Sequence, residues 1–176
     1  MSDAWQATNL VAWATAQRDM IDHIGTLTRH AQEAQTIVEF GTRGGVSTWA
    51  FLDGLPADGW LVSVDIDDCM VPMRVSNDER WSFIQGDDMD PDIQAKLPDQ
   101  ADLVFIDTSH TYAHTVMELA FAVTLHPSRI LLHDADWPGV DRAIKQFCPK
   151  YGWEMVAFDE AHDDAGPFSL ATLEPV

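Results

Sequence analysis

The chain has 176 residues, enough for one domain with a substantial core, and 46% of them are hydrophobic, which excludes a disordered protein. Its 29 acidic and 10 basic side chains give a formal net charge of −19, which argues against nucleic acid or an anionic membrane as the main partner. The charge is compatible with a small neutral or cationic ligand or with a divalent metal, although solubility alone explains most of it.

Residues 1–35 have apolar residues spaced near a period of 3.6, which predicts helices attached to the core that follows. The first twenty residues lack the basic start and unbroken apolar stretch of a signal peptide, and no segment approaches the ~20 apolar residues of a membrane helix. Cys69 and Cys148 lie far apart without a CxxC motif, which favours reduced thiols. We therefore expect a cytoplasmic protein, and the amphipathic N-terminal stretch could pair two copies as a homodimer.

From residue 36 onward, buried-strand patterns alternate with helical patterns. The predicted strands cover residues 36–41, 59–67, 81–87, 101–107, 129–134, 153–159 and 168–174. The predicted helices cover residues 45–55, 70–78, 90–98, 111–125 and 138–149. The third of these helices has Asp90 as its expected N-cap and Pro91 at its first position.

This alternation implies a parallel sheet with helices on both faces. The polar, turn-like residues 160–166 predict a hairpin between the last two strands. The fold class is therefore α/β: a Rossmann-like three-layer sandwich with a mostly parallel seven-stranded sheet and an antiparallel C-terminal hairpin strand. We expect one domain, 1–176, with N-terminal helices in 1–35 and a cofactor-binding core in 36–176.

The parallel strands of the predicted sheet all deliver carboxylates to one edge, where such sheets bind their ligands. The acids at or just beyond the ends of the five strands are Glu39, Asp65, Asp67, Asp68, Asp87, Asp88, Asp107, Asp134 and Asp136. Strand ends often carry acids, but five strands in a row with acids on one edge indicate a functional set.

The glycine turn after the first strand matches neither of two familiar phosphate-binding motifs. A dinucleotide fingerprint, G-x-G-x-x-G, would need glycine at position 43, where Arg43 stands. A P-loop would need a Lys-Ser/Thr pair after the glycines, and this segment has none. The remaining pattern is E-x-G-x-x-x-G followed by VST, which disfavours a nucleotide-cofactor oxidoreductase.

Taken together, VEFGTRGGVST, LVSVDID, FIQGDD, DLVFIDTSHTY and ILLHDADWPGV resemble the class I S-adenosylmethionine-dependent methyltransferases, in particular the small O-methyltransferase-like group. The resemblance covers residue 36 to the C-terminus by element order. It implies methyl transfer from S-adenosylmethionine to a small, hydroxylated acceptor. A non-catalytic binding module that keeps this fold and cofactor is the alternative from a different functional class.

The resemblance also implies a role for each matching residue. The methionine part of the cofactor would lie against the glycine turn and its flanks, namely Glu39, Gly41, Thr42, Gly44 and Ser47. Asp65 would accept hydrogen bonds from the ribose hydroxyls, and Asp87 or Asp88 would approach the adenine edge. Asp107 would lie beside the sulfonium and the acceptor.

Two catalytic schemes are compatible with the last strand ends. Some relatives hold a divalent metal here, and the matching ligands would be Asp107, Asp134 and Asp136 around Mg²⁺. Ala135 stands where the metal-dependent motif often has a second polar ligand, which weakens that scheme. Without a metal, His110 is the candidate general base, the alternative being a capping or loop histidine that is hydrogen-bonded to the backbone.

Other side chains near this edge have less specific interpretations. His110 and His114 form an H-x-x-x-H pair without the glutamate of an H-E-x-x-H motif, which favours a surface pair over a zinc site. His133 lies in a buried strand and is expected to be structural. Tyr112 is expected to pack near the cofactor. Trp137 could stack on an acceptor ring or anchor its loop. Trp5 and Trp13 could dock the N-terminal helices or form a lid over the cofactor.

Overall fold

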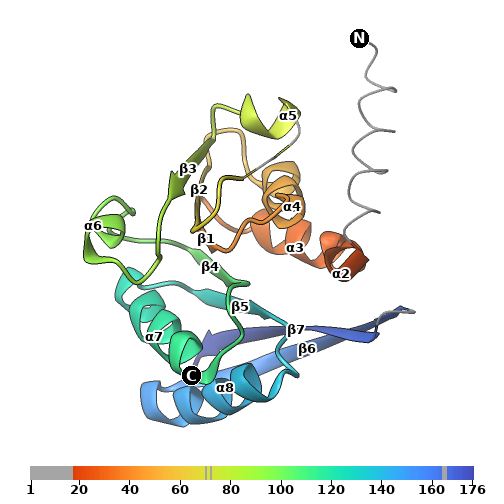
Figure 1. The fold of residues 1–176 in the computed structure, drawn as a ribbon, viewed down its shortest axis with the longest axis vertical. Helices are drawn as coiled ribbons and strands as arrows, with labels where there is room; N and C mark the ends of the chain where they lie inside the picture. The colour runs from red at the N-terminus through yellow and green to blue at the C-terminus, as the bar shows by residue number, and fades with distance from the viewer. Residues whose placement is uncertain (1–17, 70, 72, 164–165) are drawn as a thin grey trace.

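A seven-stranded sheet lies between two layers of helices in the computed structural model, which describes residues 18–69, 71, 73–163 and 166–176 (Figure 1). The strands are β1 (Thr36–Phe40), β2 (Trp60–Asp65), β3 (Trp81–Gln85), β4 (Leu103–Ile106), β5 (Arg129–His133), β6 (Trp153–Asp163) and β7 (Gly166–Pro175). The helices are α2 (Arg18–Ile21), α3 (Ile24–Ala31), α4 (Val46–Gly54), α5 (Met73–Ser76), α6 (Pro91–Gln94), α7 (Tyr112–Ala122) and α8 (Pro138–Tyr151), with a 3₁₀ turn at Val123–Leu125. The predicted fold class is confirmed.

The strand order β3-β2-β1-β4-β5-β7-β6 positions the candidate site. The first five strands are parallel, and β7 runs antiparallel to both β5 and β6. The chain steps outward from β1 to β3 and then returns to β4 on the other side of β1. The loops after β1 and β4 therefore leave the sheet in opposite directions, and a crevice forms at their carboxyl ends.

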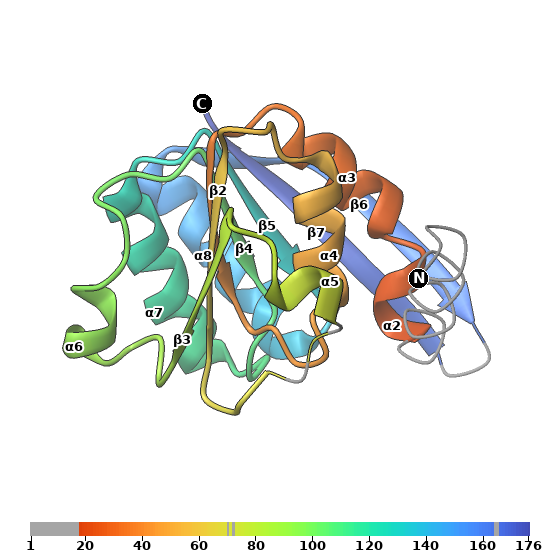
Figure 2. The ribbon, with the colours of Figure 1, turned by 90° about the horizontal axis from the view of Figure 1, so that it is seen from above.

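Alternating side chains of the strands build one apolar core on each face of the sheet. Ile37 of β1 and Phe105 of β4 pack with residues of α3 and α4, whereas Val38 and Ile106 pack with residues of α7 and α8. Figure 2 shows α3 and α4 on one side of the strands and α6 and α7 on the other. This alternation decides which face each strand-end acid points to.

The C-terminal hairpin is longer than the sequence pattern predicts. Residues 160–166, expected as a polar turn, mostly continue the two strands, since Glu160 pairs with Ser169 and Asp163 pairs with Gly166. The strand β6 lies at the edge of the sheet, where polar side chains face solvent, so polarity alone could not distinguish strand from turn here.

Within the predicted N-terminal helical region, the described helices α2 and α3 pack on the α4 face of the sheet. Trp5 and Trp13, the predicted lid residues, lie outside the described residues. The third predicted core helix begins as expected: Asp90 caps α6 by accepting a hydrogen bond from the Asp92 N–H, and Pro91 is its first residue. No helix in the described part of the chain is long and apolar enough to span a bilayer.

A buried carboxylate, Glu39 of β1, joins the strands to the helix that follows the glycine turn. Its side chain is 0% exposed and accepts hydrogen bonds from the hydroxyls of Ser47 (2.5 Å), Thr48 (2.7 Å) and Ser63 (2.5 Å). Ser63 in turn accepts a hydrogen bond from the Trp81 indole at 2.9 Å. One carboxylate therefore connects β1, β2, α4 and, through Ser63, β3.

Glu39→Ala should lower the free energy of unfolding by about 2–4 kcal/mol, because three buried hydroxyls would lose their acceptor. Burial raises the pKa of Glu39 from 4.5 to about 7, and the three hydroxyl hydrogen bonds offset burial only in part. A raised folded-state pKa stabilises the protein below pH 4.5, and this contribution is lost as the pH rises to about 7.

Urea unfolding of wild type and Glu39→Gln from pH 4 to 8 measures this loss. The stability of wild type relative to Glu39→Gln should fall by on the order of 3 kcal/mol between pH 4.5 and 7. A stability difference that stays constant with pH would contradict the assignment.

Candidate functional site

The glycine turn after β1 lies against the loop after β4. Gly41 has a positive φ of 86°, and a Cβ atom at this position would lie 1.9 Å from the backbone carbonyl oxygen of Asp107. Only glycine allows this backbone conformation together with this close approach. The contact brings the two loops of the topological switch point together.

Asp65, at the end of β2, holds the glycine turn in place. Its Oδ2 accepts hydrogen bonds from the N–H groups of Thr42 (2.7 Å) and Arg43 (2.8 Å) and from the Thr42 hydroxyl (3.2 Å). Its Oδ1 accepts one from the Asp67 N–H at 3.0 Å. Burial alone would raise the pKa of Asp65, but these hydrogen bonds outweigh it and lower the pKa. The predicted ribose acceptor thus has a structural role that the sequence did not reveal.

A cavity of about 720 Å³ opens at the carboxyl ends of the strands, within the size range of ligand pockets. Its walls are Gly41, Arg43, Gly44, residues 64–68, residues 86–88, residues 107–109 and His114 of α7. Six carboxylates and a single guanidinium line it, so the lining suits a ligand with cationic and hydroxyl groups. Ile66, which is 68% exposed, adds an apolar surface.

Three predicted cofactor residues lie beneath the cavity and not on its wall. Glu39, Thr42 and Ser47 are each at most 4% exposed, and their side chains are used in the hydrogen bonds described above. Alternation along β1 turns Glu39 toward α4, which carries Ser47. These three side chains therefore support the glycine turn from below, and their contact with the cofactor stays a prediction. Gly41, Gly44, Asp65, Asp87, Asp88 and Asp107 do line the cavity.

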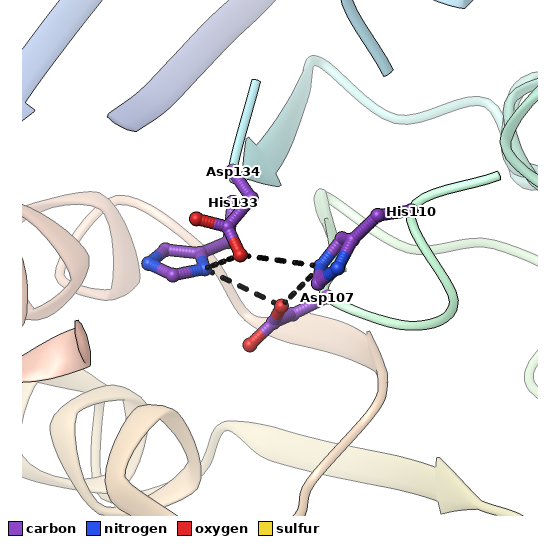
Figure 3. A group of neighbouring side chains, drawn as sticks. All are labelled: Asp107, His110, His133 and Asp134. Carbon is purple, nitrogen blue, oxygen red and sulfur yellow. Dashed lines mark hydrogen bonds and ion pairs between the residues drawn. The ribbon is translucent and has the colours of Figure 1, made fainter. Parts of the chain in front are cut away.

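The ends of β4 and β5 bring four side chains together as an Asp–His cluster, namely Asp107, His110, His133 and Asp134 (Figure 3). Nε2 of His110 lies 3.1 Å from Oδ1 of Asp107 and 3.5 Å from Oδ2 of Asp134. Nδ1 of His133 lies 3.4 Å and 3.5 Å from the same two oxygens. His133, expected to be structural, is buried, and its ring reaches the cluster from the α3 side of the sheet.

Backbone geometry holds the Asp–His cluster in shape. His110 and Asp134 have positive φ angles of 52° and 50°, an uncommon conformation for non-glycine residues that often marks functional sites. A Cβ atom on Gly139, in the first turn of α8, would lie 2.5 Å from the His110 carbonyl oxygen. Gly139 therefore lets α8 pack directly on the loop that carries His110. The sequence predicts Tyr112 near the cofactor. In the structure its hydroxyl donates a hydrogen bond to Gln146 of α8, and Tyr112 does not line the cavity.

Asp107 and His133 of the Asp–His cluster stabilise each other's charged forms. Burial alone would raise the pKa of Asp107, but His133 and His110 outweigh it and hold the pKa well below its ordinary value. Burial alone would lower the pKa of His133, but Asp107 and Asp134 raise it to about 10. Oδ1 of Asp134 is buried without a hydrogen-bond partner in the described part of the chain. The cluster can therefore hold either a proton or a cation between its two carboxylates.

Asp136, the third predicted metal ligand, does not join the Asp–His cluster. The side chain of Asp136 is exposed, and its carboxylate accepts a hydrogen bond from the hydroxyl of Ser169 in β7. The same hydroxyl accepts a hydrogen bond from the backbone N–H of Asp136 at 2.9 Å. The antiparallel strand β7 draws Asp136 away from the cluster, a tertiary effect that strand-end position does not encode. Trp137, beside it, is 50% exposed and lies 5.2 Å from the His110 ring.

A second group of titratable side chains forms part of the same edge. Nε2 of His114 lies 3.0 Å from Oδ1 of Asp88 and 3.7 Å from Oε1 of Glu118. His110 and His114 thus belong to two different partly buried groups, and the expected surface pair is wrong. Sequence reasoning missed Glu118; the available signal was an acid one turn after His114 on the apolar face of a helix.

The comparisons agree with this geometry. A family model described as a methyltransferase domain matches residues 38–135. An O-methyltransferase from Bacillus cereus in complex with SAH has a TM-score of 0.74 and 17% identity, covering 100% of this chain and 92% of its own. The O-methyltransferase TomG from Streptomyces achromogenes, involved in tomaymycin synthesis and solved with SAM, has a TM-score of 0.73 and 17% identity, with 95% and 89% covered.

A third similar structure is cofactor-bound Rv0187 from MTB, with a TM-score of 0.71, 20% identity, and 98% and 90% of the two chains covered. At these identities the structural likeness establishes the fold. No curated protein matches the chain.

Asp65→Ala should destabilise the protein by about 1–3 kcal/mol at pH 7, since the N–H groups of the turn would lose their acceptor. The lowered pKa means that this stabilisation is present above about pH 3.8 and is lost as the pH falls through the folded-state pKa. Acid unfolding curves of wild type and Asp65→Asn should therefore converge at low pH. Asp99→Asn, at an exposed acid before β4, is the control, and an equal effect of both variants would refute the role of Asp65.

Proposed function

Because this chain belongs to the methyltransferase domain family, we propose that it transfers a methyl group from S-adenosylmethionine to an oxygen atom of a small-molecule acceptor. The observation that carries this proposal is the acid-lined cavity at the topological switch point, which reaches Asp107 of the Asp–His cluster. S-adenosylmethionine has a sulfonium, an ammonium and hydroxyl donors, and an acidic lining suits all three.

The cavity walls support a specific orientation of the cofactor. The methionine part would lie over the turn, against the backbone of Gly41 and Gly44. Asp65, through the remaining capacity of Oδ1, would accept the ribose hydroxyls. The base would cover the exposed surface of Ile66 and meet Asp88, with Asp87 nearby.

Bound S-adenosylmethionine supplies an activated methyl group, so most of the catalysis by the chain is positioning. The residues at the β4 and β5 ends would hold the acceptor oxygen in line with the methyl group. Trp137 offers an exposed ring surface for the acceptor beside His110. As the methyl–sulfur bond breaks and the methyl–oxygen bond forms, the acceptor hydroxyl would release its proton to the Asp–His cluster or through it to solvent.

We also propose that the Asp–His cluster binds a divalent cation. Ligand atoms ~2.0–2.2 Å from a tetrahedral zinc ion lie about 3.3–3.6 Å apart. The four measured separations in the cluster, 3.1–3.5 Å, are close to that spacing. Two imidazoles favour zinc, manganese or iron over the Mg²⁺ expected from the sequence.

The same geometry favours His110 as a ligand over His110 as a free base, because its Nε2 faces two carboxylates. A bound cation would lower the pKa of an acceptor hydroxyl next to the methyl group.

The cytoplasmic location and the homodimer remain predictions, and the two alternative functions remain to be tested. The two cysteines of the described chain are unpaired, which supports a reducing, cytoplasmic location. A homodimer through the N-terminal stretch is compatible with the fold. A non-catalytic binding module would share the cavity and lack turnover, whereas a nucleotide-cofactor oxidoreductase would bind NAD.

Calorimetric titration with S-adenosylmethionine, S-adenosylhomocysteine and NAD tests the proposed function. We expect saturable binding of the first two and none of NAD, because the turn lacks the dinucleotide fingerprint. Transfer of a labelled methyl group to a panel of phenols, catechols and sugars then tests turnover. Binding without transfer to any hydroxyl acceptor would favour the binding module, and no binding would contradict the proposal.

Titration of EDTA-treated protein with Zn²⁺, Mn²⁺ and Mg²⁺ tests the cation site. Zn²⁺ or Mn²⁺ should bind more tightly than Mg²⁺, and Asp107→Asn or His133→Asn should weaken binding by more than about ten-fold. Asp136→Asn is the matched control and should have no effect, because Asp136 bonds Ser169 instead. Preference for Mg²⁺, or a loss of binding in Asp136→Asn, would contradict the assignment.

A further inference from the structure

A buried carboxyl pair lies behind the wall of the cavity opposite the glycine turn. Asp88 follows β3 and His114 lies on α7, and both line the cavity. Glu118, one helical turn after His114, is 0% exposed and does not line the cavity. Asp88, His114 and Glu118 each offer one polar atom within 4.8 Å of the others.

Each member of this group is fixed by contacts to a different element. Oε1 of Glu118 accepts a hydrogen bond from the Thr108 hydroxyl at 2.6 Å. Oδ1 of Asp88 faces Nε2 of His114 at 3.0 Å. The backbone carbonyl of Asp88 accepts a hydrogen bond from the Gln94 side chain at 3.0 Å, which ties the loop to α6.

Two buried oxygens in the group find no donor elsewhere in the described chain. They are Oδ2 of Asp88 and Oε2 of Glu118. A carboxylate needs a donor when it is buried, and two adjacent ionised carboxylates repel each other. Because one oxygen of each carboxyl group lies within 4.8 Å of the other, a proton on Glu118 can be shared with Asp88.

The electrostatic environment of Glu118 agrees with that proton. Burial, and to a smaller extent Asp88, raise the pKa of Glu118 from 4.5 to about 9, although the Thr108 hydrogen bond partly offsets them. Glu118 is therefore a neutral acid at neutral pH and can donate to Asp88. Nε2 of His114 lies against Oδ1 of Asp88 from the other side, and both residues line the cavity.

We propose that Glu118 and His114 are positioning residues that hold the carboxyl group of Asp88 oriented to accept a hydrogen bond from the 6-amino group of the cofactor's base. The inference rests on the proposed function, because it needs a nucleoside cofactor in this cavity. A 6-amino group donates to a carboxylate, whereas the 6-oxo group of hypoxanthine presents a lone pair to it. Selectivity for adenine over hypoxanthine would thus depend on a residue that never touches the base.

The test compares calorimetric binding of S-adenosylhomocysteine and S-inosylhomocysteine. Wild type should prefer the adenosyl compound by about ten-fold or more, as expected for one hydrogen bond to an ionised group. Glu118→Gln keeps the shape and can donate from its amide, so it should keep the preference. Glu118→Leu removes the donor and should lose most of the preference, through weaker adenosyl binding. Met117→Leu, at the half-exposed neighbouring position on α7, is the matched control and should behave as wild type.

His114 provides a second pair of variants if Glu118→Leu does not fold. His114→Leu should reduce the adenosyl preference, and His114→Gln, which can still donate, should restore it. An unchanged preference in the Leu variants, or equal loss in Glu118→Gln and Glu118→Leu, would overturn the inference while adenosyl binding upholds the proposed function. Loss of the preference on EDTA treatment of wild type would also overturn it, since a cation would then hold the group. If neither compound binds wild type, the proposed function itself fails.

Discussion

The buried carboxylate of Glu39 is the constraint on which the rest of the site depends. Burying a carboxylate away from solvent costs free energy unless hydrogen-bond donors surround it. The hydroxyls of Ser47, Thr48 and Ser63 are the donors to Glu39. These hydrogen bonds fix the first turn of α4 against β1 and β2. Asp65 then holds the turn from above by accepting hydrogen bonds from the backbone N–H groups of Thr42 and Arg43. The glycine turn is therefore held between two carboxylates, one hidden and one on the cavity wall.

The topological switch point places this rigid glycine turn next to the loop that carries Asp107. Gly41 lets the loops after β1 and β4 touch, so the position of the turn also sets the position of Asp107. Gly139 does the same for α8 and the His110 loop. His110 and Asp134 adopt left-handed conformations in these loops, which the surrounding packed segments must stabilise. Backbone contacts between loops, more than any single side chain, bring the Asp–His cluster together.

Sequence patterns predicted the sheet, its closing hairpin and the edge on which the acids gather, because strand periodicity and strand–helix alternation are local properties. They could not say which acids face a ligand. Glu39 points into the core because alternate residues of β1 face opposite sides of the sheet. Asp136 points away from the cavity because it is hydrogen-bonded to Ser169 of β7. His133 and Glu118 looked like core residues in a buried strand and an apolar helix. Their roles arise from contacts across the fold, which a single sequence does not record.

The two histidine–carboxylate groups at this edge differ in how they balance charge. In the Asp–His cluster two imidazoles meet two carboxylates, and the two histidines hold the pKa of Asp107 well below its ordinary value. In the Asp88 group one imidazole meets two carboxylates, and the fully buried acid, Glu118, retains its proton. The first arrangement can accept a cation or the proton of an acceptor; the second keeps a fixed charge pattern during the reaction. A transferase needs both properties, since one end of its cavity must change charge while the other holds the cofactor unchanged.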